Sequence, residues 1–463
     1  MTLIKSISGI RGTIGGKPGE GLSPMDVLKF TASFATFIKN SSGKKQIKMV
    51  VGRDARVSGE MVNHVICGTL MGMGVDVIDG GLSTTPTIEM AVIEEKADGG
   101  IILTASHNPE QWNALKLLNG KGEFISAEEG ASVLEMADEE GFDFAGIKEL
   151  GSYQQNDGFI DMHIKKILEL PLVDVEAIRK AGYSVAIDCV NSTGGIALPP
   201  LLKALGVKET HELYCEPNGK FPHNPEPLPE NLSEISNLVI KANVDMGFVV
   251  DPDVDRLAIV TDEGEMFGEE YTLVAVADYV LQNDKGNTVS NMSSTRALRD
   301  VTEKLGASYS ASAVGEVNVV TKMKETDAVI GGEGNGGVIY PALHYGRDSL
   351  VGIALFLTHL AKSGKKCSAL RATYPDYFIS KNKIELSPEM DVDDILIKMA
   401  EKYKAHKPST IDGVKIDFEN EWVHLRKSNT EPIVRIYAES NSESTAEYLA
   451  NKIIEDIRDI VRG

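Results

Sequence analysis

Three segments between residues 183 and 256 decide the fold: YSVAIDCVNSTGG (183–195), GVKETHELYCEPN (206–218) and VDMGFVVDPDVDR (244–256). In each, a short run containing Val or Ile gives way to Asp, Asn, Ser or Gly, and helix-length amphipathic stretches separate the runs. Short apolar strands that alternate with helices predict a largely parallel sheet covered on both faces. The sequence therefore predicts an α/β protein.

The same order of strand, loop, helix and Gly-marked strand occurs twice more. The earlier copy has segments IKMVV (47–51) with GRDARVSG (52–59), GVDVIDGG (74–81) and GGIILTASHNP (99–109). The later copy has NTVSNMSST (287–295), GASYSASAVGE (306–316) and DAVIGGEGNGG (327–337). Three units of one design account for 463 residues better than one large sheet, because single cores stop growing at about 250–300 residues.

The remaining chain has a different pattern. ISKNKIEL (379–386) and VKIDFENEWVHLRKS (414–428) alternate like strands, and STAEYLANKIIEDIRDIV (444–461) is periodic like a helix. We therefore expect four domains: three similar α/β mixed-sheet units and a C-terminal α+β domain. The expected boundaries are 1–157, 158–262, 263–373 and 374–463.

Composition excludes several classes of function. The chain has 47 Lys and Arg against 68 Asp and Glu, so its net charge of −21 disfavours nucleic acid and anionic membranes as partners. No apolar run approaches the ~20 residues that a membrane span needs, and the N-terminus lacks a signal-peptide core. The widely spaced Cys67, Cys189, Cys215 and Cys367 are expected to be buried thiols. A cytoplasmic location is expected.

Ligands of parallel sheets bind beyond the carboxyl ends of strands, so the loops there are candidate sites. In TASHNP (104–109), Ser106 lies beside His107 immediately after the apolar run GGIIL. The G-x-S-x-G elbow of serine hydrolases is missing, because Ala105 and His107 flank the serine. A turn and a nucleophilic serine both remain open on composition.

The loop DPDVDR (251–256) places three carboxylates at alternate positions. Like charges this close destabilise one another unless a cation lies between them, and a hard divalent ion with oxygen ligands suits Asp251, Asp253 and Asp255. An EF-hand is excluded because its sixth position, a glycine, is Arg256. Three ligands with open positions favour Mg²⁺ over a solvated acidic turn.

Two further loops offer groups for sugar and phosphate. GEGNGG (332–337) fits the dinucleotide pattern formally, but Pro341 follows where that pattern needs a helix. Glu333 and Asn335 could instead hydrogen-bond vicinal hydroxyls, although a plain Gly-rich turn is the default. RKSNTEP (426–432), with Arg435 nearby, offers donors for a phosphate, and an exposed basic turn is the equal alternative.

Together these loops resemble those of the α-D-phosphohexomutase family, and the resemblance covers the whole chain, including SGIRG (8–12). TASHNP resembles the family's phosphoserine loop, DPDVDR its metal loop, GEGNGG its sugar loop and RKSNTEP its phosphate loop. The resemblance implies four domains around a central cleft. It also implies phosphoryl exchange between O6 and O1 of a hexose phosphate, through a phosphoserine and a bisphosphate intermediate.

The resemblance also implies a role for individual residues. Ser106 carries the phosphoryl group and, with Asp251, Asp253 and Asp255, binds Mg²⁺. Lys116 and His107 are the acid/base candidates, and the arginines expected in the active site are Arg256, Arg11 and Arg53. Glu333 and Asn335 grip the sugar. The phosphate that is not reacting is held by Arg426, Ser428, Asn429, Thr430 and Arg435.

The substrate follows from departures within the motifs. Bacterial relatives typically carry Ser and His where this chain has Asn335 and Gly337, while the S-N-T-E-P ending resembles phosphoglucosamine mutases and their archaeal-type relatives. We therefore expect conversion of glucosamine 6-phosphate to glucosamine 1-phosphate, with hexose 1,6-bisphosphate as activator. The alternatives are a phosphomannomutase/phosphoglucomutase and a Mg²⁺-dependent sugar phosphatase. A monomer or a homodimer is expected.

Overall fold

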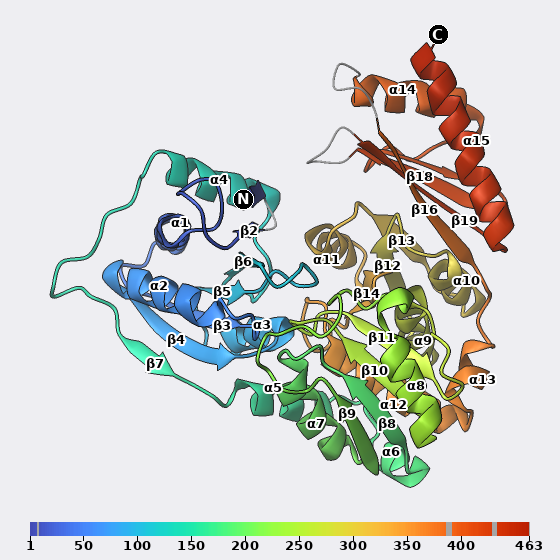
Figure 1. The fold of residues 1–463 in the computed structure, drawn as a ribbon, viewed down its shortest axis with the longest axis horizontal. Helices are drawn as coiled ribbons and strands as arrows, with labels where there is room; N and C mark the ends of the chain where they lie inside the picture. The colour runs from blue at the N-terminus through green and yellow to red at the C-terminus, as the bar shows by residue number, and fades with distance from the viewer. Residues whose placement is uncertain (7–8, 386–390, 428–432, 463) are drawn as a thin grey trace. The chain divides into compact units, whose positions relative to one another are not determined.

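The computed structural model describes every residue of the chain except 7–8, 386–390, 428–432 and 463 (Figure 1). The chain folds into two compact units. The first comprises Met1–Asn283 and Asn335–Arg371, and the second comprises Asp284–Gly334 and Ala372–Gly463. One boundary between the units therefore falls inside the predicted sugar loop, between Gly334 and Asn335.

The first sheet has seven strands in the order β1-β2-β6-β5-β3-β4-β7. The strands are β1 (Leu3–Ser6), β2 (Gly9–Thr13), β3 (Ile47–Arg53), β4 (Val75–Leu82), β5 (Gly99–Leu103), β6 (Trp112–Asn119) and β7 (Tyr153–Gln155). The helices are α1 (Pro24–Ser42), α2 (Gly59–Gly72), α3 (Thr85–Glu94) and α4 (Ala127–Asp138). The predicted strands β3, β4 and β5 pair in parallel, as expected.

Both faces of this sheet are buried, because successive strand residues point to opposite faces. Met49 and Val51 of β3 pack in the core that contains Phe30 of α1, whereas Val50 packs with Ile88 of α3. This burial explains why β3 and β5 are almost continuously apolar in the sequence. Helices on both faces leave the strand ends, and therefore the loops that follow them, as the places where chemistry can occur.

The second sheet has the order β11-β10-β8-β9. Its strands are β8 (Ser184–Asp188), β9 (Glu209–Leu213), β10 (Met246–Val250) and β11 (Leu257–Thr261). The accompanying helices are α5 (Phe159–Leu168), α6 (Val175–Ala181), α7 (Gly194–Leu205), η1 (Pro229–Asn231) and α8 (Ser233–Ala242). β8, β9 and β10 are parallel, while β11 is antiparallel to β10.

The sheets are mixed, as expected, and two of their antiparallel pairs bear on the candidate loops. β6 is antiparallel to β5, and β11 is antiparallel to β10. TASHNP therefore lies in the reversal between β5 and β6, and DPDVDR is the reversal between β10 and β11. Each loop is fixed at both ends by a strand of the same sheet, which restricts the positions that its side chains can take.

The third segment carries the parallel strands β12 (Asn287–Asn291), β13 (Tyr309–Ser312) and β14 (Ala328–Glu333), with β12 central among them. Helices α10 (Ala297–Lys304) and α11 (Glu316–Glu325) connect these strands. The elements α9 (Glu269–Asn283), β15 (Gly337–Ile339), α12 (Ser349–Ser363) and α13 (Cys367–Arg371) belong to the first compact unit. As expected from Pro341, a strand and turns follow GEGNGG instead of a helix.

The C-terminal domain is an antiparallel sheet with helices, as predicted. Its strands β16 (Phe378–Glu385), β17 (Val414–Asp417), β18 (Trp422–Lys427) and β19 (Ile433–Ser440) have the order β16-β19-β18-β17. Its helices are α14 (Val392–Lys402), η2 (Lys404–His406) and α15 (Glu443–Arg462). The sequence patterns used above did not identify α14 or β19. Apolar residues of α14, α15, β17, β18 and β19 form one core, and Ile384 of β16 packs against it.

Two remaining expectations concern membranes and cysteines. Over the part of the chain that the structure describes, helices long and apolar enough to cross a bilayer are absent. All four cysteines are free thiols. Cys67, Cys189 and Cys367 are buried as predicted, but Cys215 is only half-buried, which corrects the expectation for that residue.

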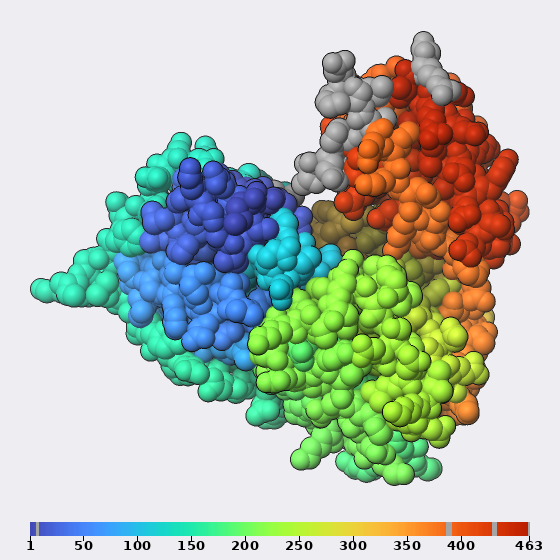
Figure 2. All heavy atoms as spheres, viewed as in Figure 1, coloured from blue at the N-terminus to red at the C-terminus, as the bar shows by residue number. Residues whose placement is uncertain are grey.

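The segment between α4 and β7 crosses the outside of the first sheet and protrudes at the edge of Figure 2. It exposes the apolar side chains of Phe144 and Ile147. The N–H of Ala145 donates to Gly72 O at 2.8 Å, and that of Gly151 donates to Met71 O at 2.9 Å. These main-chain bonds hold the segment against the end of α2.

Candidate active site

Ser106 lies in the reversal after β5 and is buried in a strained backbone conformation. Its φ is +47°, in the left-handed region that residues with a side chain rarely adopt. The N–H of Ser106 donates to Thr104 Oγ1 at 2.9 Å, which stabilises this turn. The reversal and the strain together hold the Ser106 hydroxyl at the sheet edge.

A buried arginine that the sequence analysis did not select holds the same loop. Arg56, in GRDARVSG after β3, is 1% exposed, and its Nε donates to Asp54 Oδ2 at 3.0 Å. The guanidinium also donates to four main-chain oxygens, those of Ser106 (2.5 Å), Asn108 (2.6 Å), Pro109 (2.7 Å) and Trp112 (3.0 Å). Its position at the carboxyl end of a parallel strand was the available signal.

The three carboxylates of the acidic loop are fully buried. Val254 has a φ of +65°, which is unusual for a β-branched residue. Asp251 Oδ1 accepts the main-chain N–H groups of Asp255 and Arg256, each at 3.1 Å. Pro252 O accepts the hydroxyls of Ser192 and Thr193 at 2.6 and 2.9 Å. These hydrogen bonds fix the conformation of the acidic loop.

The acidic loop meets the serine directly. Ser106 Oγ donates to Asp251 Oδ2 at 2.7 Å, although the two residues lie 145 positions apart in the sequence. The structure thus brings together the two loops that the sequence analysis singled out separately.

The acidic loop fits a hard divalent cation. One oxygen from each of Asp251, Asp253 and Asp255 lies within 4.8 Å of the others. The Oδ1 atoms of Asp253 and Asp255 are buried without a hydrogen-bond partner, an arrangement that is costly unless a ligand accepts their charge. Burial, followed by the charges of Asp255 and Asp253, raises the pKa of Asp251. A divalent ion would relieve this repulsion.

The ammonium group of Lys116, on β6, offsets part of the negative charge of the acidic loop. Its Nζ lies 2.7 Å from Asp253 Oδ2 and 3.3 Å from Asp255 Oδ2. Burial alone would lower the pKa of Lys116, but the two carboxylates outweigh it and raise that pKa. The two carboxylates therefore favour the charged form of Lys116.

His107 lies beside the serine hydroxyl and is uncharged. Its Nδ1 is 3.4 Å from Ser106 Oγ, and its Nε2 is 3.8 Å from Glu226 Oε1. Burial, together with the charge of Arg256, lowers the pKa of His107 to about 3. The imidazole therefore lies within reach of the serine hydroxyl in surroundings that favour its neutral form.

Two further residues hold the acidic loop and were not found from the sequence. Thr85, at the start of α3, donates its hydroxyl to Asp253 Oδ2 at 2.5 Å and its N–H to Asp253 O at 2.9 Å. Arg347 donates Nη2 to Asp255 Oδ2 at 2.6 Å. Burial would raise the pKa of Asp255, but Arg347 and then Lys116 lower it.

The side chain of Arg347 also accounts for the glycine at position 337. A Cβ added to Gly337 would lie 2.4 Å from Arg347 Cδ, so the arginine stem occupies the space that a side chain at position 337 would need. The end of the predicted sugar loop and the acidic loop are thereby connected through one side chain.

The other predicted arginines lie at different positions. Arg256 is partly buried, with Nε 4.0 Å from Asp255 Oδ1 and Nη1 3.5 Å from Glu226 Oε1. Arg11 is exposed on β2, opposite Ala114 of β6. Arg53 ends β3 and donates to Asp54 O at 3.3 Å. Arg256 thus lies at the acidic loop, while direct roles for Arg11 and Arg53 stay predictions.

The predicted sugar-binding residues are ordered by main-chain and amide groups. Glu333 ends β14 and is buried, and its Oε1 accepts from Asn291 Nδ2 at 2.9 Å and from Gly315 N at 3.1 Å. Asn335 Oδ1 accepts the N–H of Gly337 at 3.3 Å. Glu333 belongs to the second compact unit and Asn335 to the first.

Two arginines of the predicted phosphate loop lie on neighbouring strands. Arg426 of β18 is directly opposite Arg435 of β19. Like charges in this register repel, and an anion bound between them would remove the repulsion. Arg426 Nε lies 2.9 Å from Asp412 Oδ2. Ser428, Asn429 and Thr430 lie outside the residues that the structure describes.

One known protein family matches four successive segments of the chain. Residues 3–143, 161–264 and 268–377 match "Phosphoglucomutase/phosphomannomutase, alpha/beta/alpha" domains I, II and III, and residues 385–456 match the C-terminal domain of the same family. These four matches follow one another in the order that the α/β units and the C-terminal sheet have in the structure.

Similar proteins agree on the family. A "Phosphoglucomutase/phosphomannomutase" of Thermococcus kodakarensis is 39% identical over 95% of this chain and 96% of its own length. A "Phosphoglucosamine/phosphogalactosamine mutase" of Sulfurisphaera tokodaii is 32% identical over 98% of each chain. A Burkholderia thailandensis phosphoglucomutase/phosphomannomutase family structure superimposes with a TM-score of 0.86, at 26% identity over 99% of this chain and 98% of that one. The chain therefore belongs to the α-D-phosphohexomutase family, whose members are isomerase-type phosphotransferases.

Proposed function

We propose that this phosphohexomutase converts glucosamine 6-phosphate to glucosamine 1-phosphate through a phosphorylated Ser106 and a hexose 1,6-bisphosphate. The observation that carries the covalent step is the 2.7 Å hydrogen bond from Ser106 Oγ to Asp251 Oδ2, beside two buried carboxylate oxygens without partners. A serine held against an acidic cation site is suited to carry a phosphoryl group, because phosphoryl transfer depends on positioning and charge neutralisation.

In the forward half-reaction, the bond between phosphorus and Ser106 Oγ breaks, and a bond forms from phosphorus to a free hydroxyl of the sugar phosphate. The sugar hydroxyl loses its proton and the serine oxygen gains one, so the step needs a base and an acid. We assign this acid/base work to Lys116, with His107 assisting beside Ser106 Oγ at 3.4 Å. The second half-reaction reverses the transfer with the other phosphate.

Asp251, Asp253 and Asp255, with an oxygen of the phosphorylated Ser106, would hold Mg²⁺. When bound, this ion neutralises the charge of the transferring phosphoryl group. Arg256, which lies at the acidic loop, would bind the same phosphoryl oxygens. Arg56, Thr85 and Arg347 act as positioning residues, because they contact the two loops rather than the reacting atoms.

Substrate binding is assigned to the other two loops. Glu333 and Asn335 would accept the sugar hydroxyls, and Arg426 and Arg435 would hold the phosphate that is not reacting, together with Ser428, Asn429 and Thr430. The direct opposition of Arg426 and Arg435 supports this assignment, since two guanidinium groups in one register can both donate to a dianion, and Arg426 also pairs with Asp412.

Two kinds of sugar phosphate are candidates for the substrate. The S-N-T-E-P ending favours glucosamine phosphate, and the relative from Sulfurisphaera tokodaii carries that activity in its name. A second candidate is glucose or mannose phosphate, which the name of the 39% identical relative from Thermococcus kodakarensis favours.

The covalent step is tested by intact mass and activity. The purified protein incubated with bisphosphate should gain ~80 Da at Ser106, and Ser106→Ala should lose both the adduct and mutase activity. Ser33→Ala is the matched control, because Ser33 is also buried but its hydroxyl donates to Lys29 O within α1. Full turnover by Ser106→Ala would reject the phosphoserine mechanism.

The substrate is tested separately. Coupled assays with Mg²⁺ and catalytic bisphosphate compare kcat/KM for glucosamine, glucose and mannose 6-phosphates. A kcat/KM at least about tenfold higher for glucosamine 6-phosphate supports the proposal, since tenfold corresponds to about 1.4 kcal/mol of transition-state discrimination. A preference for glucose or mannose phosphate assigns the second candidate. Release of inorganic phosphate without isomerisation would instead indicate a sugar phosphatase.

A further inference from the structure

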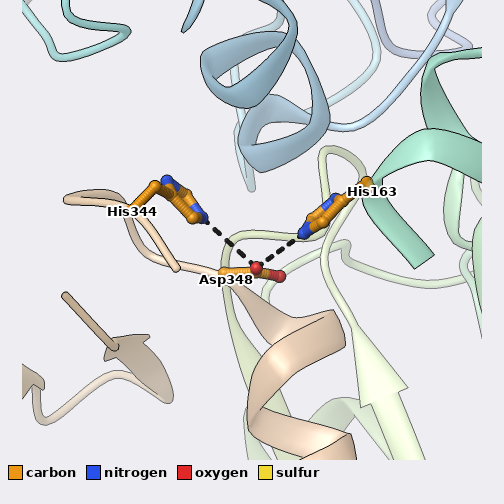
Figure 3. Close-up of side chains that lie close together, drawn as sticks. All are labelled: His163, His344 and Asp348. Atoms are coloured by element: carbon orange, nitrogen blue, oxygen red, sulfur yellow. Dashed lines mark hydrogen bonds and ion pairs between the residues drawn. The ribbon is translucent and has the colours of Figure 1, made fainter. Parts of the chain in front are cut away.

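A second cluster of ionisable side chains lies inside the first compact unit, separate from the acidic loop. It consists of His163 on α5, His344 in the turns after β15, and Asp348, the N-cap of α12 (Figure 3). All three side chains are buried, and His163 and Asp348 are fully inaccessible. Asp348 lies 185 positions from His163, so the fold, and not a local motif, assembles the cluster.

The three side chains converge on one point. Both imidazoles direct Nε2 toward the same carboxylate oxygen, Asp348 Oδ2, at 2.9 Å from His163 and 3.3 Å from His344 (Figure 3). One ligand atom from each residue lies within 4.8 Å of the others. Ligands about 2.0–2.1 Å from a tetrahedral metal ion are separated by roughly 3.3 Å, so these distances match a coordination shell.

The atoms that face away from this point are also held. His163 Nδ1 lies 2.9 Å from Thr87 Oγ1, and His344 Nδ1 lies 3.3 Å from Glu89 Oε2, both on α3. Asp348 Oδ1 accepts the N–H groups of Leu350 and Val351, at 2.8 and 3.3 Å, in the first turn of α12. Metal-binding histidines usually donate their second nitrogen to a carboxylate or another oxygen, which fixes the ring and its tautomer.

We propose that His163, His344 and Asp348 form a second metal site, which binds a divalent transition-metal ion such as Zn²⁺ through two imidazole nitrogens and one carboxylate oxygen. Imidazole ligands favour Zn²⁺ and its neighbours, whereas the all-oxygen acidic loop favours Mg²⁺. The two sites therefore select different ions, and water can complete the shell of the second.

Charge balance agrees with this assignment. The cluster contains two buried carboxylates, Asp348 and Glu89, and one divalent ion bound by two neutral imidazoles would match their charge.

The cluster is connected to the acidic loop by its neighbours in sequence. Ser349, which follows Asp348, donates its N–H to Val254 O at 3.2 Å, and Arg347, which precedes it, contacts Asp255. Residues Thr87 and Glu89 lie on the helix whose Thr85 contacts Asp253. A metal ion here would lock α3, α5 and α12 together behind the acidic loop. We assign it a structural and positioning role, not a chemical one.

The experiment uses the full chain, stripped of metal and then saturated with Mg²⁺ to occupy the acidic loop. Titration with Zn²⁺ at pH 8 should show one site, and Co²⁺ should give the intense visible bands of a four-coordinate ion with nitrogen ligands. His163→Gln and His344→Gln should each weaken Zn²⁺ binding at least about 100-fold, because two remaining ligands hold the ion poorly.

The matched control is His359→Gln. His359 is also buried on α12 and pairs with one carboxylate, Asp278, at 3.4 Å, but it lies outside the cluster. The His359→Gln variant should bind Zn²⁺ as the wild type does. If the histidine variants do not fold by circular dichroism, Glu89→Gln takes their place, with binding about 10–100-fold weaker.

Two results would overturn the proposal. The first is wild-type protein that binds no Zn²⁺ above the level of His163→Gln at pH 8. The second is binding that the cluster variants leave unchanged, since that would place the ion elsewhere. In either case the cluster is a hydrogen-bonded ion network, and the mutase mechanism is unaffected because neither readout uses activity.

Discussion

Arg56 Nη2 donates to the main-chain oxygen of Ser106 at 2.5 Å, so a buried guanidinium from the loop after β3 holds the proposed phosphoserine in place. The same side chain contacts three further carbonyl groups of residues 108–112 and the carboxylate of Asp54. Lysine has one nitrogen and cannot reproduce this fork of donors. The geometry of Ser106 therefore depends on arginine specifically.

Arg56→Lys should lower kcat about 10–100-fold with little change in KM. Carbonyl groups left without a partner cost about 1–3 kcal/mol, and tenfold in rate corresponds to about 1.4 kcal/mol. Steady-state kinetics and thermal unfolding measure the two effects separately. Arg179→Lys serves as the control, because Arg179 is largely exposed on α6. Wild-type kcat in Arg56→Lys would show that the loop keeps its conformation without this arginine.

Thr85→Val should weaken Mg²⁺ binding about tenfold. The hydroxyl of Thr85 donates to Asp253 Oδ2, and outer contacts of this kind typically change metal affinity 10–100-fold. Mg²⁺ dependence of activity and direct calorimetric titration both report the affinity. Thr69→Val is the control, since buried Thr69 donates to Val65 O within α2. Equal Mg²⁺ affinity in both variants would mean that Thr85 does not orient Asp253.

The sequence allowed the strands and the loops after them to be predicted, because apolar runs that end in polar loops are local patterns. TASHNP after β5 and DPDVDR after β10 were found in this way. Mixed sheets were expected, but β6 and β11 were not identified as the antiparallel strands, since burial on both faces hides strand direction in the sequence. β19 was missed although Val434, Ile436 and Ala438 alternate with Arg435, Tyr437 and Glu439.

The contacts that hold the site could not be predicted in the same way. Arg347 and Asp255 are 92 residues apart, and Thr85 and Asp253 are 168 residues apart, so no spacing connects them. A lone Thr or Arg also has many ordinary structural roles, and only the packing of α3 and α12 against the acidic loop distinguishes these two. The cluster around Asp348 was hidden for the same reason.

Gly337→Ala should disturb the acidic loop through Arg347. The added methyl group would lie 2.4 Å from Arg347 Cδ, so the arginine stem must move and its contact with Asp255 weakens. We expect weaker Mg²⁺ binding and lower kcat in Gly337→Ala than in the wild type. In a chain that already carries Arg347→Ala, adding Gly337→Ala should have little further effect. A double-mutant cycle should give a coupling of about 1 kcal/mol or more.

The control for this cycle is Gly68→Ala on α2, where a new Cβ meets no atom within 4 Å. It should leave Mg²⁺ binding unchanged. Strictly additive effects of Gly337→Ala and Arg347→Ala would contradict the steric connection, because independent sites show no coupling.

His424 on β18 should make the second compact unit sensitive to acid. Its ring is buried, Nε2 contacts Asp412 O at 2.6 Å and Nδ1 contacts Ser293 Oγ at 2.9 Å. Burial lowers the pKa of His424 to about 4, and the charges of Lys415 and Arg426 act in the same direction. The neutral ring can donate through Nε2 and accept through Nδ1, which matches these two partners.

The sign of the pH effect follows from this lowered pKa. As the pH falls below about 6.5, His424 takes up a proton in the unfolded chain, whereas in the folded chain it does so only near pH 4. The contribution of His424 to stability is therefore complete above pH 6.5 and is lost as the pH falls to 4. This loss is on the order of a few kcal/mol at most, since one pKa unit corresponds to about 1.4 kcal/mol.

Hydrogen exchange of peptides from β18 and β19 measures this loss at pH 7, 5.5 and 4.5. His424→Gln cannot titrate, so the difference in protection between the wild type and the variant should shrink as the pH falls. Comparison at each pH cancels the intrinsic exchange rate and the titration of other groups, including the buried Glu439. A difference that stays constant from pH 7 to 4.5 would show that the folded chain protonates His424 as readily as the unfolded chain does.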